Sequence, residues 1–331
     1  MVEIVITLLI VALLAGLVLW AGGGKTLHAS HGSGIIEAIP GALEASPPPP
    51  DELLVLSYSL GYGLDEAQQT RVRPAAVYDR LDAVIESIAA SGAEIALLQE
   101  VDFASRRTHA VDQLQYIAAA LGWGFVARVI TWECRYLPLP FWLPWQHAGR
   151  VRAGQGVISR YPLVQNTRQR LSQPAAQPLV APLFAPYNTV QMVEVQCGSR
   201  TARLLNVDLE AHEPATRQRQ AQELVAFVRQ VATPNCVLMG ALHGADQALE
   251  SLITGLRDRL RRVVETESPS HELLPPVRLQ HALVGPGLQT VEVQRLAPEG
   301  TSVSGDRPLL VRVRWALPLT SQHRSTNHEH A

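Results

Sequence analysis

The hexapeptide Leu97-Leu98-Gln99-Glu100-Val101-Asp102 decides how this chain is interpreted, because a buried strand ends there beside acidic side chains. Glu94–Gln99 has the short apolar run that favours a buried strand. An earlier run, Leu53–Tyr58, has the same character, and between the two lies Val77–Ala90, whose apolar residues recur at helical spacing. Strand, helix and strand in this order predict a layered domain built on a sheet.

The rest of the chain continues this mixed pattern. Helical spacing recurs at 111–121 and 215–231. Further strands are predicted at 125–130, 156–159, 191–195, 202–207, 236–239, 282–284, 291–293 and 309–315. Because strands and helices do not alternate strictly, we expect an α+β domain rather than a strand-helix repeat.

Six short segments, spread over roughly residues 52 to 316, together resemble one hydrolase family. They are 55–63 (VLSYSLGYG), 97–102 (LLQEVD), 154–162 (GQGVISRYP), 205–211 (LNVDLEA), 237–243 (VLMGALH) and 304–308 (SGDRP). In order and spacing they are similar to the endonuclease/exonuclease/phosphatase superfamily, and 135–140 and 166–168 resemble a bacterial branch of it. The resemblance implies the DNase I-like fold, a four-layer β-sandwich flanked by helices.

The same resemblance implies a chemistry, the hydrolysis of phosphate esters with a divalent metal. In the family an Asn on the first strand and the Glu of the second motif hold Mg²⁺, while a His and a later Asn bind the phosphate. An Asp positions the attacking water, and a terminal Asp-His pair completes the site. Metal and donors neutralise developing charge, and a general base delivers the nucleophile.

Carried over to this chain, the pattern keeps only Glu100, as a weak metal ligand. The other family positions are replaced, and the residues now standing there are Ser59, Asp208, Ala241, His243, His281 and, in the final pair, Gly305-Asp306. Ala241 cannot orient water, and Asp208 places a negative charge where the family binds a phosphate. The leading hypothesis is therefore a catalytically inactive pseudo-hydrolase with no cofactor, acting as a structural or accessory subunit.

Two alternatives stay open. The first is an active metal-dependent phosphoesterase acting on a phosphodiester or lipid headgroup, with Mg²⁺ or Mn²⁺ in a site rebuilt from the replacements. The second is a binding module that holds a phosphorylated ligand without cleaving it. Its phosphate-contact candidates are Arg106, Arg107 and Arg160, which a solvated surface would also explain.

A membrane anchor is predicted at the N-terminus, over residues 1–21. Ile4 to Gly24 carries no charge, and about twenty helical residues span the roughly 30 Å of a bilayer's hydrocarbon core. A cleaved signal peptide is the alternative, but the segment before the apolar run holds Glu3 and no basic residue. Lys25 lies after the span, which favours a cytoplasmic main domain. The expected partners are the bilayer, through residues 4–21, and membrane proteins.

The remaining boundaries follow from composition. Residues 22–50 are rich in Gly and Pro and predict a tether, 51–318 form the main domain, and 319–331 a polar tail. The loop 138–145 gathers Phe141, Trp142 and Trp145 between prolines, and it predicts either a buried flap or an exposed patch for a membrane or partner. The net charge of −2 shows no basic excess, so nucleic acid is not an expected partner.

Overall fold

The computed structural model describes residues 1–22, 31–40, 50–64, 72–138, 144–174, 184–243, 247–263, 280–296 and 307–316. Asp306, Lys25, Phe141, Trp142 and the predicted tail lie outside these residues. Predictions that concern them therefore remain predictions.

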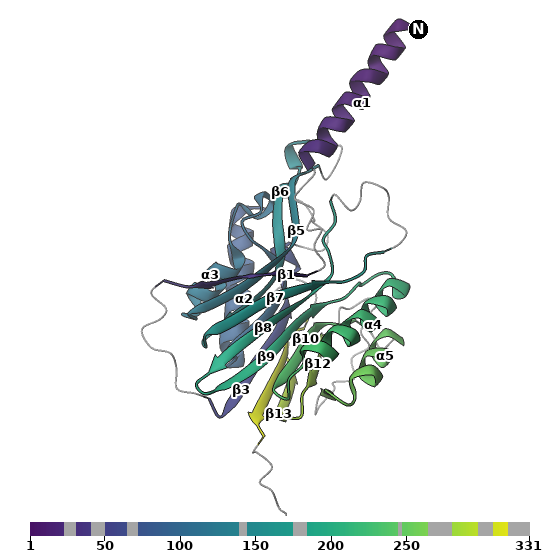
Figure 1. Cartoon of the computed structure of the whole chain (residues 1–331). Coiled ribbons are helices and arrows are strands. Elements are labelled where there is room, and N and C mark those ends of the chain that lie inside the picture. The colour runs from purple at the N-terminus through teal and green to yellow at the C-terminus, as the bar shows by residue number, and fades with distance from the viewer. Residues whose placement is uncertain are drawn as a thin grey trace, which may run out of the picture.

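Within the described residues, two seven-stranded sheets form the centre of the domain (Figure 1). The first sheet has the order β13-β14-β3-β4-β6-β5-β2 and the second β1-β7-β8-β9-β10-β12-β11. The strands of the first sheet are β2 (Ile35–Ala38), β3 (Glu52–Ser59), β4 (Ile95–Asp102), β5 (Phe125–Leu137), β6 (Gly149–Ser159), β13 (Leu288–Arg295) and β14 (Leu309–Trp315). Those of the second are β1 (His31–Ser33), β7 (Leu163–Arg170), β8 (Thr189–Cys197), β9 (Arg200–Asp208), β10 (Cys236–Ala241), β11 (Arg261–Val263) and β12 (Gln280–Val284).

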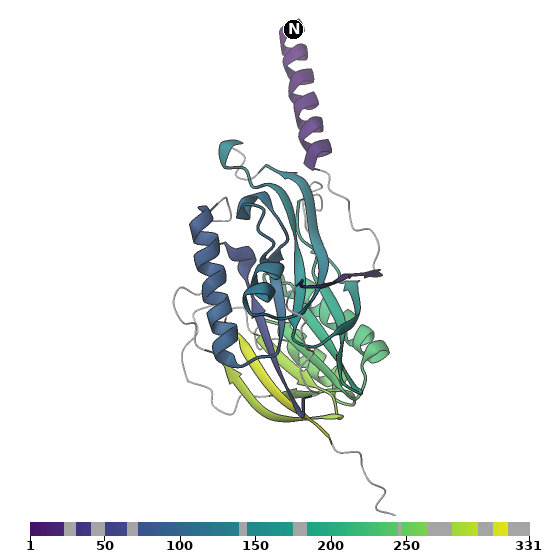
Figure 2. The same cartoon turned by 90° about the vertical axis from the view of Figure 1, so that its left-hand side faces the viewer.

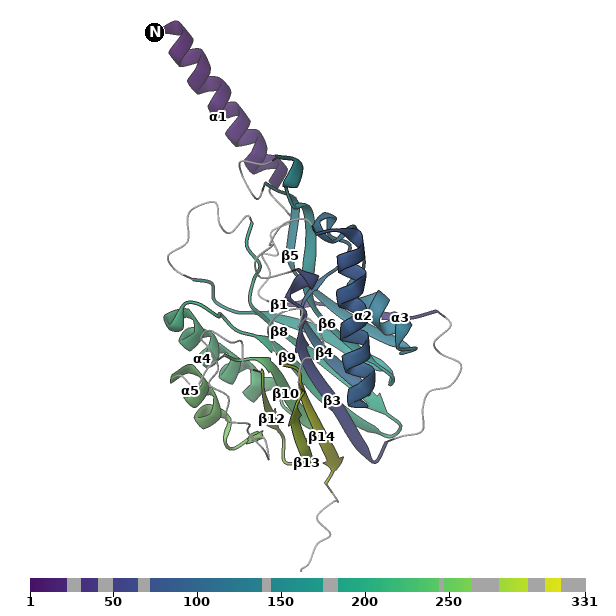
Figure 3. The same cartoon turned by 180° about the vertical axis from the view of Figure 1, so that it is seen from behind.

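Helices cover the outer face of each sheet, which confirms the predicted four layers. The helices are α2 (Pro74–Ser91) and α3 (Gln113–Ala120) against the first sheet, and α4 (Pro214–Val231) and α5 (Gln247–Leu256) against the second. Figure 2 shows α2 on one side of the sheets and the green helices on the other, and Figure 3 shows α2 and α3 from behind. A third apolar cluster, which includes Leu53, Val55 and Leu97, fills the space between the sheets.

The predicted strands and helices are found at their expected places, but some extend further. β5 and β6 continue past the sandwich and form a long hairpin, whereas the sequence pattern indicated strands only at 125–130 and 156–159. A separate apolar cluster supports this extension, and it contains Cys134, Leu137, Ala148, Val151 and Ala153. The described residues also form short 3-10 turns at η1 (Gly61–Gly63), η2 (Arg106–Thr108) and η3 (Pro144–Gln146).

The predicted tether, 22–50, includes residues that belong to the folded domain. His31–Ser33 pairs with β7 of the second sheet, and Ile35–Ala38 pairs with β5 of the first. The next residue, Ile39, is 7% exposed and joins the core. We call residues 31–39 the strap, because they close one side of the sandwich across both sheets. Composition missed the strap because its pairing partners are distant in sequence.

α1 (Val2–Gly22) confirms a helix over the predicted anchor. It projects from the domain and contacts β5 at the hairpin (Figure 1). A membrane-crossing helix, which needs both length and continuous apolarity, is not found in the described part of the chain.

Candidate functional site

Four of the replaced or retained family positions meet at one end of the sandwich. β3 runs parallel to β4, and β9 runs parallel to β10. Ser59 and Glu100 lie at the ends of the first pair, and Asp208 and Ala241 are aligned with each other at the ends of the second. The carboxyl ends of parallel strands meet at one edge of a sheet, so residues far apart in sequence come together here.

A bulge in β4 aims the carboxylate of Glu100. The register with β6 shifts between Leu98 and Val101, and Glu100 has φ 52°. Because side chains alternate along a strand, a regular strand would place Glu100 on the face opposite Gln99. Instead the hydroxyl of Ser59 donates to Glu100 Oε2 at 2.9 Å, and Glu100 is only 9% exposed. A left-handed backbone at a non-glycine residue is strained, and the surroundings hold it in place.

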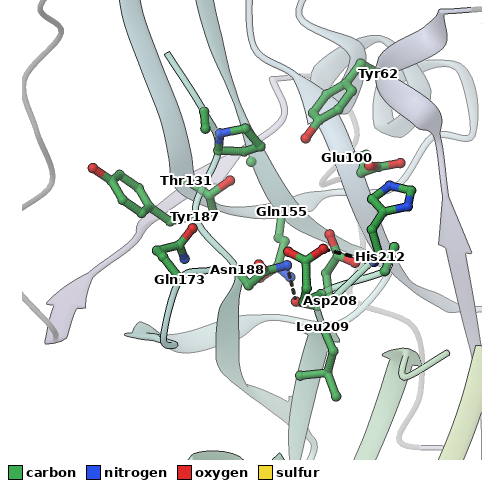
Figure 4. Close-up of a pocket in the computed structure, with 15 residues that line it drawn as sticks. Tyr62, Glu100, Thr131, Gln155, Gln173, Tyr187, Asn188, Asp208, Leu209 and His212 are labelled. Atoms are coloured by element: carbon green, nitrogen blue, oxygen red, sulfur yellow. Dashed lines mark hydrogen bonds between the residues drawn. The ribbon is translucent and has the colours of Figure 1, made fainter. Parts of the chain in front are cut away.

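A pocket of about 220 Å³ opens at this end of the sandwich (Figure 4). Its acidic lining residues are Glu100, Asp208 and Glu210, and His212 lies beside them. Tyr62 and Tyr187 contribute rings to the wall. The neutral polar lining residues are Thr131, Gln155, Gln173 and Asn188. The described lining residues include no Lys or Arg, so the charge of the pocket is negative.

His243 and His281 lie behind Asp208, outside the pocket lining. His243 Nε2 donates to the backbone oxygen of Leu209 at 2.9 Å, and His281 Nε2 donates to that of His243 at 3.2 Å. Burial lowers the pKa of His281 to about 4, and the charges of Arg262 and Arg295 add to this effect. His281 is therefore neutral near pH 7, and both rings serve to fix the backbone behind the site.

The three arginines predicted to contact phosphate lie in different places. Arg107 is 3% exposed and donates two hydrogen bonds to Asp102, from Nε at 3.0 Å and from Nη2 at 2.7 Å. Its guanidinium also lies 4.5 Å from the ring centre of Tyr62. Arg106 is exposed beside the β5–β6 hairpin, near Gly149. Arg160 follows β6, and its N–H donates to Glu94 at the start of β4, so it lies at the opposite end of the sandwich from Glu100.

The charge of Arg107 is neutralised by the carboxylate of Asp102. Burial lowers the pKa of Arg107, but the charge and hydrogen bonds of Asp102 outweigh this effect and raise it above the ordinary arginine value. The guanidinium is stacked on both Tyr62 and Trp132, whose ring centre is 4.6 Å away. Arg107 therefore positions Tyr62 at the wall of the pocket and is not available to a ligand.

A buried network of neutral polar groups lies between this pocket and the apolar part of the sandwich. Gln99 Nε2 donates to Asn206 Oδ1 at 2.7 Å and to Ser57 Oγ at 3.0 Å. Asn206 Nδ2 donates in turn to Gln191 Oε1 at 3.2 Å. Ser57 donates to Gln280 Oε1 at 2.7 Å, so the network joins both sheets. Satisfied networks of this kind fix a unique packing of the elements that they join.

A model of the endonuclease/exonuclease/phosphatase family matches residues 57–306. The chain belongs to this family. No curated protein matches the chain.

Solved structures of family members share the fold at low identity. An endonuclease/exonuclease/phosphatase from Beutenbergia cavernae is 17% identical, with a TM-score of 0.56, over 80% of this chain and 72% of its own. The catalytic domain of human Nocturnin with bound sulfate is 15% identical, with a TM-score of 0.56, over 86% of this chain and 98% of its own. A mannosyl-6-phosphatase from Bacteroides thetaiotaomicron is 13% identical, with a TM-score of 0.52, over 80% of this chain and 100% of its own.

The divalent metal that the family implies does not match the donors present. Glu100 is the retained ligand, and its neighbour Ser59 offers a hydroxyl whose proton is directed at the carboxylate. Among the described residues, no group of three or more His, Cys, Asp or Glu side chains is arranged to hold a metal ion. Mg²⁺ prefers octahedral coordination by oxygen, which Glu100 and Ser59 alone do not supply.

Sequence reasoning missed several residues of the pocket. Glu210 and His212 follow Asp208 at alternate positions directly after β9, a signal that could have been recognised. Tyr187 and Asn188 precede β8 and carry no such signal. They reach the pocket because β8 pairs with β9, with Thr189 opposite Asp208.

Proposed function

We propose that this member of the endonuclease/exonuclease/phosphatase family no longer hydrolyses phosphate esters and serves as a membrane-attached accessory or structural subunit. The observation that carries the proposal is the charge of the pocket at the family's catalytic end. Glu100, Asp208 and Glu210 line it, and no Lys or Arg is among its described lining residues.

The pocket charge opposes the binding of a phosphate ester. Two like charges about 5 Å apart repel by about 3 kcal/mol at an effective dielectric constant of about 20. A phosphate group would meet this repulsion from Asp208, at the position where the family has a His. Ala241 adds a second loss, since it offers no group that could orient water, and a missing general base lowers a rate by about 10²–10⁴-fold.

The test of inactivity is a hydrolysis assay of the full chain with Mg²⁺ or Mn²⁺ against a panel of phosphomonoesters and phosphodiesters. We expect the same background rate from the natural chain, from Glu100→Ala and from Glu292→Ala, a control on β13 whose side chain is about half exposed. Metal-dependent turnover that Glu100→Ala abolishes and Glu292→Ala retains would contradict the proposal.

A second candidate function is a metal-dependent phosphoesterase with a rebuilt site. One observation favours it, because Glu100, Asp208 and Glu210 share a single pocket beside His212. Calorimetric titration of Mg²⁺ and Mn²⁺ separates the two candidates. Micromolar binding that disappears in Glu100→Ala supports the phosphoesterase, whereas heats identical in the natural chain and in Glu100→Ala support the inactive subunit.

The proposed membrane attachment and accessory role draw on α1 and its sequence. The large apolar side chains described in α1 are between 50% and 73% exposed. A helix that is apolar on all sides is normally covered by protein or lipid. When cells are fractionated without detergent, we expect the chain in the membrane fraction, and after mild detergent extraction of those membranes we expect it within a larger assembly. Recovery in the soluble fraction, or as a lone monomer, would contradict this part of the proposal.

A further inference from the structure

The tip of the β5–β6 hairpin combines an exposed aromatic side chain with exposed arginines. Trp145, in η3, is 71% exposed, the largest exposed fraction of any described large apolar side chain outside residues 1–22. The exposed basic residues around it are Arg106, Arg135 and Arg150. We call these four residues the hairpin tip.

The arginines of the hairpin tip lie close together on the two strands and the neighbouring turn. Arg150 follows Gly149, whose α-carbon faces the side chain of Arg106, and Arg135 lies opposite this part of β6. The nearest acidic residue of β5, Glu133, is aligned with Arg152.

The two strands that carry the hairpin tip are anchored to each other. The apolar cluster under it, with Cys134, Leu137 and Val151, anchors the two strands beyond the sandwich. Tyr136 and His147 form a hydrogen bond at 2.5 Å across the hairpin. An exposed tryptophan beside these anchored strands presents apolar surface beyond the sandwich.

The position of the hairpin tip relates it to α1. The end of α1 contacts β5, and Figures 1 and 3 show the hairpin projecting toward that helix. Tryptophan is enriched at membrane–water interfaces, and arginines near an anionic membrane surface each contribute about 1 kcal/mol. A surface with one tryptophan, three arginines and an adjacent apolar helix is complementary to an anionic bilayer.

We propose that the hairpin tip is a second membrane contact, in which Trp145 enters the bilayer interface and the three arginines bind anionic headgroups. This inference rests on the membrane attachment proposed for α1. It also predicts how the domain is oriented relative to the bilayer. Thr131, Gly154 and Gln155 of the pocket come from β5 and β6, the two strands that form the hairpin. The pocket then lies on the bilayer side of the domain.

Site-specific labelling of the full chain in lipid nanodiscs tests the contact. The native cysteines are buried, and burial raises the pKa of Cys197 and Cys236 to about 12, so an introduced surface cysteine reacts selectively. An environment-sensitive fluorophore is placed in three separate variants: Trp145→Cys in the hairpin tip, Ile10→Cys in α1, and Val291→Cys on β13, which is 45% exposed. The nanodiscs contain phosphatidylcholine with or without phosphatidylserine.

We expect blue-shifted emission and quenching by lipid-borne quenchers at positions 10 and 145, and water-like emission at position 291. Phosphatidylserine should strengthen the signal at position 145, and replacement of the three arginines by glutamate should abolish that gain. A lipid signal at 10 with a water-like signal at 145 overturns the inference and leaves the attachment of α1 intact. Water-like signals at both positions overturn both. A signal at 145 that ignores phosphatidylserine and the arginines overturns the headgroup contact.

Discussion

At the scale of single residues, buried charged and titratable groups near the site control the stability of this region. His281 is one of them, because burial lowers its pKa to about 4 while the imidazole of an unfolded chain titrates near 6.5. The unfolded chain therefore binds more protons between these values, and the free energy of unfolding falls as the pH drops from about 6.5 toward 4. The full difference is about 3 kcal/mol.

Urea unfolding at pH 7.5 and at pH 5 measures this effect. We expect His281→Gln, which keeps a hydrogen-bond donor but does not titrate in this range, to reduce the loss of stability at pH 5. His31→Gln, at an exposed position, is the matched control and should behave as the natural chain does. Equal pH dependence in the natural chain and in His281→Gln would contradict the prediction.

Asp102 is the second such residue, since it neutralises a guanidinium that is 3% exposed. Asp102→Ala leaves Arg107 buried without its partner, and breaking a buried pair in this way lowers stability by about 3–5 kcal/mol. Asp258→Ala removes the partner of Arg229 in an exposed pair and should change stability by about 1 kcal/mol or less. Chemical denaturation measures both variants, and equal losses would argue against the buried pair.

The structure brings together those motif positions that lie on parallel neighbouring strands. Two parallel strand pairs carry these positions near their carboxyl ends, Ser59 and Glu100 on one pair and Asp208 and Ala241 on the other. The order of the motifs along the chain is therefore enough to place them at the same end of the sandwich. Arg160 follows an antiparallel strand, which carries it to the other end of the sandwich. Strand direction depends on long-range pairing, and local sequence does not reveal it.

At the scale of elements, the strap shows how a segment with weak local signals acquires structure from its partners. Asn166 Nδ2 donates to the backbone oxygens of Ile35 and Arg128, each at 3.0 Å, and the Arg128 side chain pairs with Glu37. Polar residues and glycines in the strap predicted a spacer by composition alone. The edges of two finished sheets supply the hydrogen bonds that make it two strands.

Gly34 is the position where the strap passes from one sheet to the other. An added Cβ there would lie 2.1 Å from Asn166 Nδ2 and 2.7 Å from the backbone oxygen of Arg128. Gly34→Ala should therefore lower stability by about 1–3 kcal/mol, as overpacking typically does. Ser33→Ala, at the neighbouring exposed residue, should stay within about 0.5 kcal/mol. Faster hydrogen exchange of the strap amides in Gly34→Ala alone would confirm the local cause, and unchanged exchange would contradict it.

At the scale of the whole molecule, the space between the sheets changes from apolar to neutral polar to acidic along the strands. Leu53, Val55 and Leu97 pack in the apolar part, Gln99 and the amide network follow, and the pocket carboxylates come last. Short apolar runs and helical spacing predicted a layered domain, and the family resemblance implied four layers. Neither predicted which amides join across the sheets, because those hydrogen bonds link residues that are distant in sequence, such as Gln155 and Thr189, 34 positions apart, or Gln99 and Asn206, 107 positions apart.

Asn206 offers the sharpest test of this arrangement. Its Nδ2 donates to the backbone oxygens of Leu98 and Gly156 and to Gln191 Oε1. Asn206→Asp removes these donors and places a carboxylate opposite three acceptors, so we expect a loss of about 3 kcal/mol or more at pH 7. The folded chain would hold the proton of that carboxyl more tightly than the unfolded chain, so the loss should grow as the pH rises above about 4. Gln289→Glu, the same exchange at an exposed position of β13, should change stability by about 0.5 kcal/mol or less. Urea unfolding across this pH range decides the matter, since a loss in Asn206→Asp that is small or constant with pH would mean that the network does not hold the two sheets together.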